Sequence, residues 1–320
     1  MADILHLVDK PEGWTSHDAV ARLRTVLGEH RVGHAGTLDP FASGLLLVGE
    51  GRATGVLGCL GLLPKRYLAR ARFGVATDTQ DRTGATTRES ADLPTAAQVD
   101  AALERFRGAI RQRPPLYSAV KVGGTRLYKA ARKGLDVERE ERTVHVYALT
   151  RVDDGARDDA GSGATLAEVT LDVTVSRGTY VRTIAHDLGE VLGCGAHLSE
   201  LRRVASGPYR VEDALSCDRS LGHDAEALRG RALSLDEALS FLPRVALSTE
   251  EASRLRHGQS PSLEQDRVQP NDGAWPLPPG ECGWPLALAE PGGGILALAR
   301  PWEAQAAGDP ALLQRVLVGA

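Results

Sequence analysis

Residues 65–75, KRYLARARFGV, alternate between apolar and mainly basic side chains. The apolar positions are Tyr67, Ala69, Ala71, Phe73 and Val75, and the positions between them include Arg66, Leu68, Arg70 and Arg72. A strand places successive side chains on opposite faces, whereas a helix would scatter this pattern around its axis. We therefore predict a strand with Tyr67 on its apolar face and a largely basic opposite face.

Other segments predict both strands and helices. Residues 4–9, 142–152 and 165–176 have the composition and alternation of strands, and the last two would pair. Ser16 can cap a helix whose apolar positions recur at helical spacing: Ala19, Val20, Leu23, Val26 and Leu27. Residues 95–108 and 179–193 predict two more helices, the second capped by Thr179. The patterns alone indicate the α+β class.

The composition changes near Pro243. Residues 248–258 begin like a capping box, and residues 260–285 are rich in Pro and Gly. Residues 287–301, ALAEPGGGILALARP, are typical of a hairpin through three glycines. We therefore predict two domains, 1–243 and a small β-rich unit at 244–320.

The chain is long enough to bury a sizeable core, with 320 residues of which 42% are hydrophobic. No apolar run is long enough to span a bilayer, and the N-terminus lacks the features of a signal peptide. The four cysteines lie far apart without metal-ligand spacing. We expect a cytoplasmic protein with no disulfide framework and no structural metal.

Charge is distributed unevenly along the chain. The formal net charge is −4, which by itself does not suggest a nucleic-acid partner. Residues 107–142, however, contain ten Lys or Arg and four acids, a local balance of +6. Such a segment can attract nucleic acid, although a solvated charged surface would have the same composition.

Asp39 lies in the Gly-rich stretch GHAGTLDPFASG, residues 33–44, which we expect to be a loop. An Asp before Pro in such a stretch is usually a turn residue whose side chain accepts backbone N–H groups. The stretch does not stand alone, because further motifs accompany it in order: DKPEGWTS (9–16), KRYLARARFGVATDTQDRTG (65–84), RQRPPLYSAVKVGGTRLYKAARKG (111–134), SRGTYVRTIAHDLG (176–189) and CGAHLSELRR (194–203). Together these motifs resemble the TruB family of tRNA pseudouridine synthases, over most of residues 4–215.

The resemblance implies a pseudouridine synthase fold, which is a mixed, largely antiparallel sheet flanked by helices. It also implies an RNA-clamping insertion at about 107–142 and a β-barrel-like, PUA-type RNA-binding domain at 244–320. The implied activity is isomerisation of a uridine in the T-loop of tRNA, position 55, to pseudouridine. The implied partner is the tRNA T-arm, with no metal, no organic cofactor, no membrane and no obligate protein partner.

By resemblance, three residues carry the chemistry. Asp39 is the nucleophile, since a carboxylate can add to C1′ or C6 or assist loss of the C2′ proton, and the sequence does not choose among these routes. Arg182 supplies a cation that keeps a buried carboxylate ionised, and Tyr67 stacks on the base. As a phenol, Tyr67 is a poor resting base, so we expect stacking first and proton transfer second. A salt bridge at a helix surface and a core tyrosine are the structural alternatives for Arg182 and Tyr67.

Seven further residues match substrate-binding or supporting positions of the family. His34 fills the space that the flipped uridine vacates, and Leu201 packs on the flipped base. Asp81 is expected in the active-site network, and Tyr180 is expected beside Arg182. Lys10 is expected to support the catalytic loop, and Lys129 and Arg132 belong to the RNA-clamping insertion. Gly55 stands where family members often have a lysine.

Two other functions fit parts of the same pattern. A tRNA-binding or tRNA-folding protein would hold the T-arm without obligatory chemistry. An enzyme for a small nucleoside would act on free uridine and would not need the basic segment 107–142.

Overall fold

The computed structural model describes most of the chain: residues 2–118, 121–122, 125–126, 139–152, 165–218, 224–270, 275–281, 283–301 and 313–317, with the backbone alone at 121–122, 125–126 and 313–316. The chain divides into two compact units, one formed by Met1–Pro64 with Ala205–Ala320 and the other by Lys65–Val204. In the part of the chain that is described, no helix is long and apolar enough to cross a membrane.

The first unit contains the part of a larger mixed sheet that is built on β1 (Ile4–Lys10). Strand β3 (Ser43–Glu50) runs antiparallel to β1, and β2 (Val32–Ala35) runs antiparallel to β3. Strand β14 (Leu215–Ser216) is parallel to β1 and β15 (Leu233–Ser234) is antiparallel to it. The other elements of this part are η1 (Gly51–Val56), α2 (Leu57–Leu60), β13 (Tyr209–Arg210), η3 (Val211–Asp213), α6 (Ala225–Gly230) and α7 (Leu235–Ala238).

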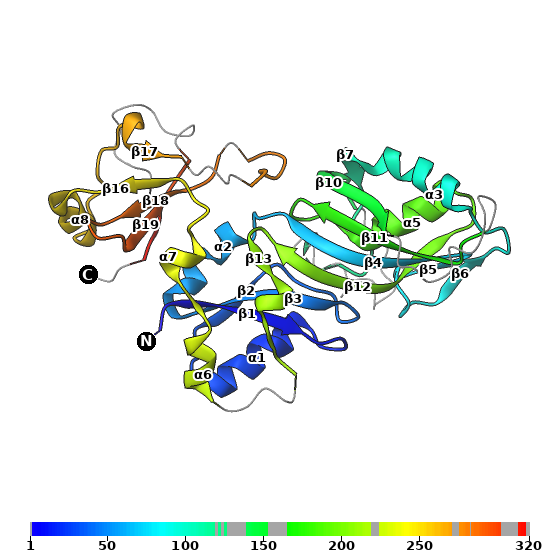
Figure 1. The fold of residues 1–320 in the computed structure, drawn as a ribbon, viewed down its shortest axis with the longest axis horizontal. Helices are drawn as coiled ribbons and strands as arrows, with labels where there is room; N and C mark the ends of the chain where they lie inside the picture. Colours follow the sequence, from blue (N-terminus) through cyan, green and yellow to red (C-terminus); the bar gives the residue numbers. More distant parts are fainter. Residues whose placement is uncertain are drawn as a thin grey trace. The chain divides into compact units, whose positions relative to one another are not determined.

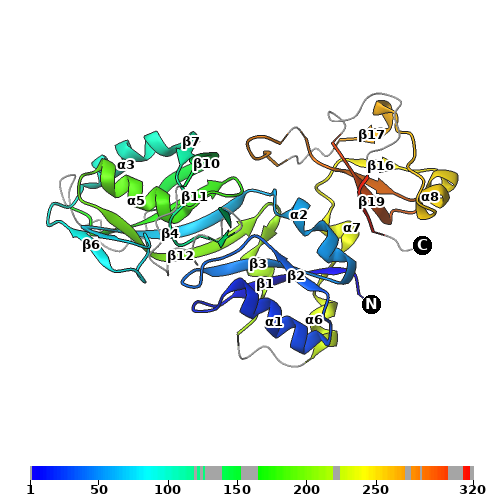
Figure 2. The ribbon, with the colours of Figure 1, turned by 180° about the vertical axis from the view of Figure 1, so that it is seen from behind.

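Helix α1 (Ser16–Leu27) packs its apolar stripe on this sheet (Figure 2). All five predicted apolar positions of the helix are buried, together with Val8 of β1 and Leu46 and Val48 of β3. The cap differs from the prediction, because Thr15 closes a capping box with Asp18 and Ser16 is the first helical residue. The Ser16 hydroxyl is therefore available for another contact.

A second sheet begins at β16 (Arg244–Ala246), where the β-rich segment was predicted to start. Its strand order is β17-β16-β18-β19-β20, with β17 (Val268–Gln269), β18 (Leu286–Ala289), β19 (Ile295–Ala299) and β20 (Leu313–Val316). Strands β18 and β19 form the predicted hairpin, and its turn uses positive φ at Gly292 and Gly293. Helix α8 (Thr249–Arg256) has the predicted capping box at Ser248, and η4 (Gln265–Arg267) precedes β17. Barrel-like closure and separation as a domain stay predictions.

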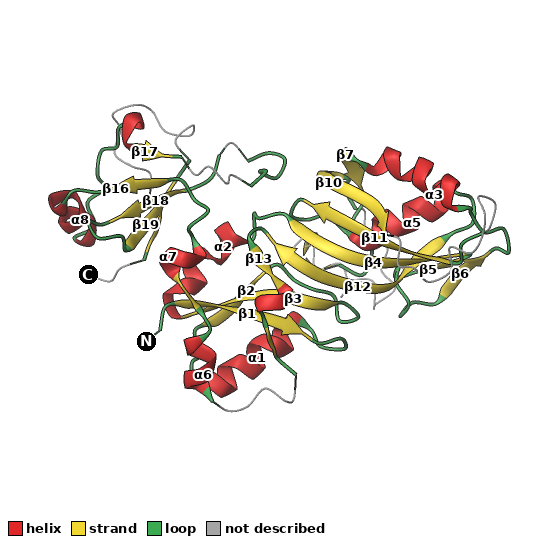
Figure 3. Cartoon of the chain, viewed as in Figure 1, coloured by secondary structure: helices red, strands yellow, loops and turns green. Residues whose placement is uncertain are grey.

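The second unit contains a largely antiparallel part of a larger sheet, in the order β12-β4-β11-β10-β7 (Figure 1). Helices α3 (Ala96–Leu103) and α5 (Val181–Val191) contact each other and pack on strands of this sheet (Figure 3). The strands are β4 (Lys65–Phe73), β7 (Gly108–Gln112), β10 (Arg142–Val152), β11 (Glu168–Val175) and β12 (Ala196–Ser206). The remaining elements are β5 (Val75–Thr77), β6 (Thr86–Glu89), η2 (Glu104–Phe106), β8 (Lys121–Val122) and β9 (Thr125–Arg126).

The predicted strand at 65–75 forms but breaks at Gly74. Tyr67, Ala69, Ala71 and Phe73 are buried, so the alternation identified the core face correctly. Gly74 has φ 84°, and a Cβ atom there would lie 2.8 Å from the carbonyl oxygen of Ser90, so the chain turns from β4 into β5.

Two predicted helix ends also move. Tyr180 is the N-cap of α5, whereas the Thr179 hydroxyl donates to the carbonyl of Ser176. The helix predicted at 95–108 starts at Ala96 and continues after Leu103 as η2, and Gly108 already begins β7.

Candidate active site

A buried lysine holds the loop that carries Asp39. Lys10 is 0% exposed, and its Nζ donates to the carbonyl of Ala42 at 2.6 Å. It also donates to the carbonyl oxygens of Pro11 at 2.8 Å and Trp14 at 2.6 Å. The amide of Ala42 in turn donates to the carbonyl of Asp39 at 3.1 Å. One ammonium group therefore ties the end of β1 to the residues that follow Asp39.

The hydroxyl of Ser16 holds the same loop just before Asp39. Its Oγ accepts from the amide of Leu38 at 2.8 Å and donates to the carbonyl of the same residue at 3.3 Å. The amide of Gly13 donates to the carbonyl of Pro40 at 2.7 Å. Asp39 itself is half-buried. Hydrogen bonds thus hold the backbone on both sides of the Asp39 carboxylate.

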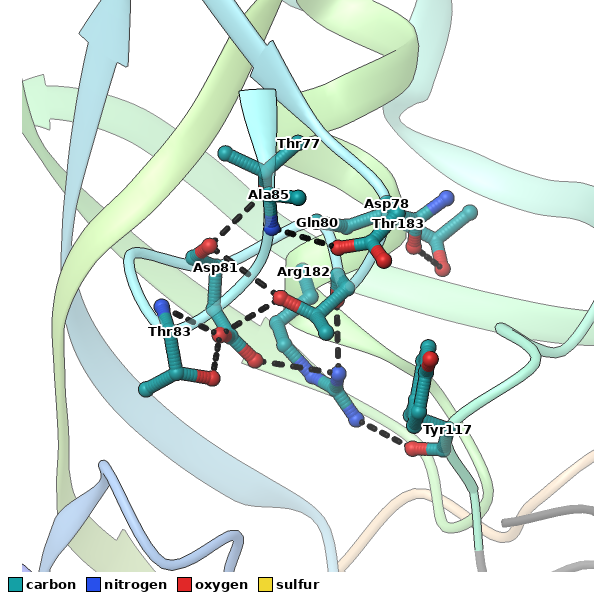
Figure 4. Close-up of polar contacts among 10 residues, drawn as sticks. Thr77, Asp78, Gln80, Asp81, Thr83, Ala85, Tyr117, Arg182 and Thr183 are labelled. Atoms are coloured by element: carbon teal, nitrogen blue, oxygen red, sulfur yellow. Dashed lines mark hydrogen bonds and ion pairs between the residues drawn. The ribbon is translucent and has the colours of Figure 1, made fainter. Parts of the chain in front are cut away.

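In the second unit, Arg182 and Asp81 form a buried ion pair (Figure 4). Arg182 is the second residue of α5, and its Nη1 lies 3.1 Å from Oδ2 of Asp81. Both side chains are almost fully buried. The guanidinium also donates from Nη1 to the carbonyl of Thr79 at 2.8 Å and from Nη2 to the carbonyl of Tyr117 at 3.0 Å. These contacts fix the plane of the guanidinium as well as its charge.

The second oxygen of Asp81 has its own set of donors. Oδ1 accepts from the Thr79 hydroxyl at 2.8 Å, and from the amide and hydroxyl of Thr83 at 2.9 and 2.6 Å. Thr79 and Thr83 flank Asp81 at a spacing of two residues on either side, so the turn itself satisfies this oxygen. The other oxygen is left to face Arg182.

The turn around Asp81 depends on unusual backbone positions. Gln80 has φ 63°, and its side chain accepts from the Thr183 hydroxyl at 2.8 Å, which joins the turn to α5 (Figure 4). At Gly84, a Cβ atom would lie 2.3 Å from Oδ1 of Asp78, so only glycine fits without displacing that side chain. These observations account for Gly84 and for the side-chain contact of Gln80 within the local sequence DTQDRTG.

Two predicted base-contacting residues lie on neighbouring strands of the second unit. Tyr67 is buried on β4, opposite Val173 of β11, and Leu201 is buried on β12. Lys65 lies on the same face of β4 as Tyr67 and is also buried. Burial, together with the positive charges of Arg203 and Arg177, lowers the pKa of Lys65 to about 7.

The predicted site residues are divided between the units. Lys10, His34 and Asp39 belong to the first unit, and His34 lies on β2 opposite Val48 rather than in a loop. The second unit contains the other described site residues: Tyr67, Asp81, Tyr180, Arg182 and Leu201. Of these, the structure joins Asp81 and Arg182 directly. Lys129 and Arg132 lie outside the described residues.

The predicted basic face of β4 is partly neutralised by acids on adjacent strands. Arg66 donates from Nε to Asp172 of β11 at 2.8 Å, and Arg70 lies 3.4 Å from Glu200 of β12. The described part of residues 107–142 also contains ion pairs, which are Arg107–Glu104, Arg111–Glu141 and Arg113–Glu141. These pairs are exposed enough that water and salt screen them.

Sequence reasoning missed several groups that hold the site residues. Thr83 could have been found from its spacing to Asp81, which, like that of Thr79, is typical of side chain to backbone turns. The Tyr117 carbonyl and the Gln112 side chain had no such signal. Gln112 contacts Tyr180 across 68 positions of sequence, so no local pattern encodes the pair.

Comparison with known proteins gives consistent results over most of the chain. Residues 24–181 match the model of the TruB family pseudouridylate synthase N-terminal domain, and residues 182–240 match that of the tRNA pseudouridylate synthase B C-terminal domain. The tRNA pseudouridine synthase B of Thermobifida fusca is 44% identical over 301 residues, which cover 93% of this chain and 94% of that protein. The same enzyme of Geobacter sulfurreducens is also 44% identical, over 81% of this chain and 82% of that protein.

Solved structures agree with the sequence relatives. A chain in the crystal structure of a Cbf5-Nop10-Gar1 complex matches with a TM-score of 0.70 and 26% identity, covering 99% of this chain and 85% of that one. The predicted mixed, largely antiparallel sheet flanked by helices is confirmed. Two adjoining family models, together with relatives of 44% identity over 93% and 81% of the chain, show that this chain belongs to the TruB family of pseudouridine synthases.

Proposed function

We propose that this enzyme isomerises a uridine in the T-loop of tRNA, at position 55, to pseudouridine. The observation that carries the proposal is the 44% identity to tRNA pseudouridine synthase B over 93% of the chain. The substrate is the T-arm stem-loop, which we expect to be recognised through its shape and its flipped bases. We place the reaction in the cytoplasm, with no obligate protein partner.

Asp39 is proposed as the nucleophile. The bond from C1′ to N1 of the base breaks, the uracil turns, and a bond from C1′ to C5 forms, while C5 loses its proton and N1 gains one. Substrate and product have the same composition, so the step needs no oxidant, no co-substrate and no cofactor. A carboxylate suffices because it can add to carbon or accept a proton. The contacts of Lys10 and Ser16 support this role, since they hold the backbone on both sides of Asp39.

Arg182 and Tyr67 are proposed to serve the same reaction. A guanidinium favours the ionised form of a carboxylate nucleophile, and an aromatic ring offers a flat surface to the uracil. We propose His34 as the group that fills the vacated stack, and Tyr180 and Leu201 as contacts of the flipped base. Residues 244–320 are proposed as a PUA-like RNA-binding domain, and the preceding residues 1–243 as the catalytic domain.

The proposal is tested with a T-arm stem-loop that carries tritium at C5 of its uridines, because isomerisation releases that tritium to water. We expect the wild type to release it and Asp39→Asn to bind the same RNA without releasing it. Asp18→Asn is the matched control, since it makes the same chemical change at an exposed carboxylate of α1 in the same unit. Tritium release by Asp39→Asn at the wild-type rate would contradict the assignment of the nucleophile.

The same experiment separates the two rival functions. A tRNA-binding or tRNA-folding protein would bind the stem-loop without releasing tritium in any variant. An enzyme for small nucleosides would convert free uridine and would not require the stem-loop.

The basic segment 107–142 is proposed to bind the T-arm through its phosphates. Charge reversal at Lys129, Arg132 and Lys133 together is expected to weaken RNA binding and to flatten its dependence on salt, because fewer counterions are released. Unchanged affinity and an unchanged salt slope would contradict this role.

A further inference from the structure

Gln112 makes two hydrogen bonds to one residue at the start of α5. Its Oε1 accepts from the amide of Tyr180 at 2.7 Å, and its Nε2 donates to the carbonyl of Tyr180 at 2.9 Å. Gln112 is the last residue of β7 and is 2% exposed. A side-chain amide is the neutral group that can satisfy a backbone N–H and C=O of the same residue at once.

Tyr180 is the residue at which α5 begins. It has extended φ and ψ of −101° and 106°, and its own side chain makes no capping hydrogen bond. Its carbonyl accepts from the amides of Thr183 and Ile184, so it belongs to the first turn of the helix. Arg182 lies in that turn. The orientation of Tyr180 therefore sets the direction in which the arginine leaves the helix.

The same stretch of chain contacts α5 a second time. Five residues after Gln112, the carbonyl of Tyr117 accepts from Nη2 of Arg182 at 3.0 Å (Figure 4). The first contact fixes the backbone before Arg182 and the second fixes its guanidinium. Both come from the first part of the basic segment 107–142.

We propose that Gln112 is a positioning residue for the isomerisation, which holds Tyr180 and Arg182 in their working orientation and links them to the first part of the RNA-clamping insertion. This inference rests on the proposed function. Gln112 acts through Tyr180 and Arg182, because the two hydrogen bonds described above are both made to the backbone of Tyr180.

Replacement by glutamate gives a sharp test, since Glu has the same shape but the carboxylate cannot donate to the Tyr180 carbonyl. When protonated, the same carboxyl group can again accept from the amide and donate to the carbonyl. The rate of the variant relative to the wild type should therefore be highest at the acidic end of the accessible pH range. Among the described residues, the charged and titratable groups on β7, β10 and α5 or directly beside them are Arg111, Arg113, Glu141, Arg142, His145, Tyr147, Arg151, Arg182, His186, Asp187 and Glu190.

The experiment compares single-turnover tritium release from the T-arm stem-loop by the wild type, Gln112→Glu and Gln112→Met between about pH 5.5 and 9. We expect the maximal rate of Gln112→Glu at the alkaline end to fall about 10- to 100-fold, with RNA affinity changed much less. Its rate relative to the wild type should rise as the pH falls and the introduced carboxyl gains its proton. Gln112→Met lacks both hydrogen bonds, so its relative rate should be low and independent of pH.

The outcomes separate this inference from the proposed function. If the wild type releases tritium and both variants match it within about twofold at every pH, the inference is wrong while the function stands. Parallel, pH-independent losses in both variants, or the failure of both to fold, would reduce Gln112 to a structural residue and also overturn the inference. If the wild type releases no tritium, the proposed function fails and this role fails with it.

Discussion

Asparagine in place of Asp81 would leave the buried guanidinium of Arg182 beside a neutral amide. If the Asn oxygen keeps the three donors of Thr79 and Thr83, the NH2 group of Asn takes the place of Oδ2. It then points a donor at Nη1 of Arg182, which lies 3.1 Å from Oδ2 of Asp81 in the wild type. If the amide is flipped, its NH2 group faces those three donors instead. Neither orientation satisfies every group in the network.

The expected cost follows from burial. Arg182 and Asp81 are 3% and 5% exposed as side chains, so water does not replace the lost partner. Removing one member of a buried ion pair typically costs about 3–5 kcal/mol. The double variant Asp81→Asn/Arg182→Met should cost less than the sum of the single variants, with a coupling energy of about 1–3 kcal/mol, because it leaves no buried charge behind.

Native-state hydrogen exchange measures this cost locally, which matters because two units need not unfold together. Peptides from the turn at 77–84 and from α5 should exchange more than about 100-fold faster in Asp81→Asn if opening becomes easier by about 3 kcal/mol. The matched control is Asp172→Asn, which breaks the exposed pair with Arg66 and should cost less than about 1 kcal/mol. Equal effects of the two substitutions, or strict additivity in the double variant, would refute the reasoning from burial.

Three further predictions concern stability. Lys65→Met should stabilise the protein most below about pH 7, where the wild-type lysine is buried in its charged form. The pKa of Lys65 is lowered to about 7, so above that pH the unfolded wild type holds a proton that the folded wild type lacks. Urea unfolding should therefore show that the extra stability of Lys65→Met shrinks as the pH rises toward 10. Gly189→Ala would place Cβ 2.2 Å from the amide nitrogen of Ala196, and the backbone shift that follows should cost about 1–3 kcal/mol and lower the melting temperature. Gly58→Ala is the control, because its Cβ meets open space and the substitution should be neutral or slightly stabilising. Gln80 has φ 63°, so Gln80→Gly should change the free energy of unfolding by less than about 1 kcal/mol, whereas Gln80→Val should lower it by about 1–3 kcal/mol. Equal unfolding midpoints for the two variants would show that this backbone position is not strained.

Local patterns predicted the elements well where a single rule decides the structure. The alternation in residues 65–75 identified the buried face of β4, and the helical spacing after Ser16 identified the buried face of α1. The cap of α1 was misplaced by one residue because Ser16 and Thr15 are both good caps, and the choice depends on a distant contact, that of Ser16 with Leu38.

The candidate site was predicted in a different way. Asp81 and Arg182 are 101 residues apart, and no periodicity connects them, so they were brought together by resemblance to a family. Gln112 and the Tyr117 carbonyl were missed for the same physical reason. Their contacts are tertiary, and one of them uses a backbone oxygen that every residue type possesses.

Lys10 has a consequence for how the loop around Asp39 keeps its shape. Its ammonium group collects three carbonyl oxygens at 2.6–2.8 Å, much as a small bound cation gathers oxygen ligands. Here the cation is covalently attached to β1, so it cannot dissociate, exchange with other ions or be removed by a chelator. The conformation of the loop around Asp39 is therefore held by a cation that is part of the chain, and these three contacts need no ion from solution.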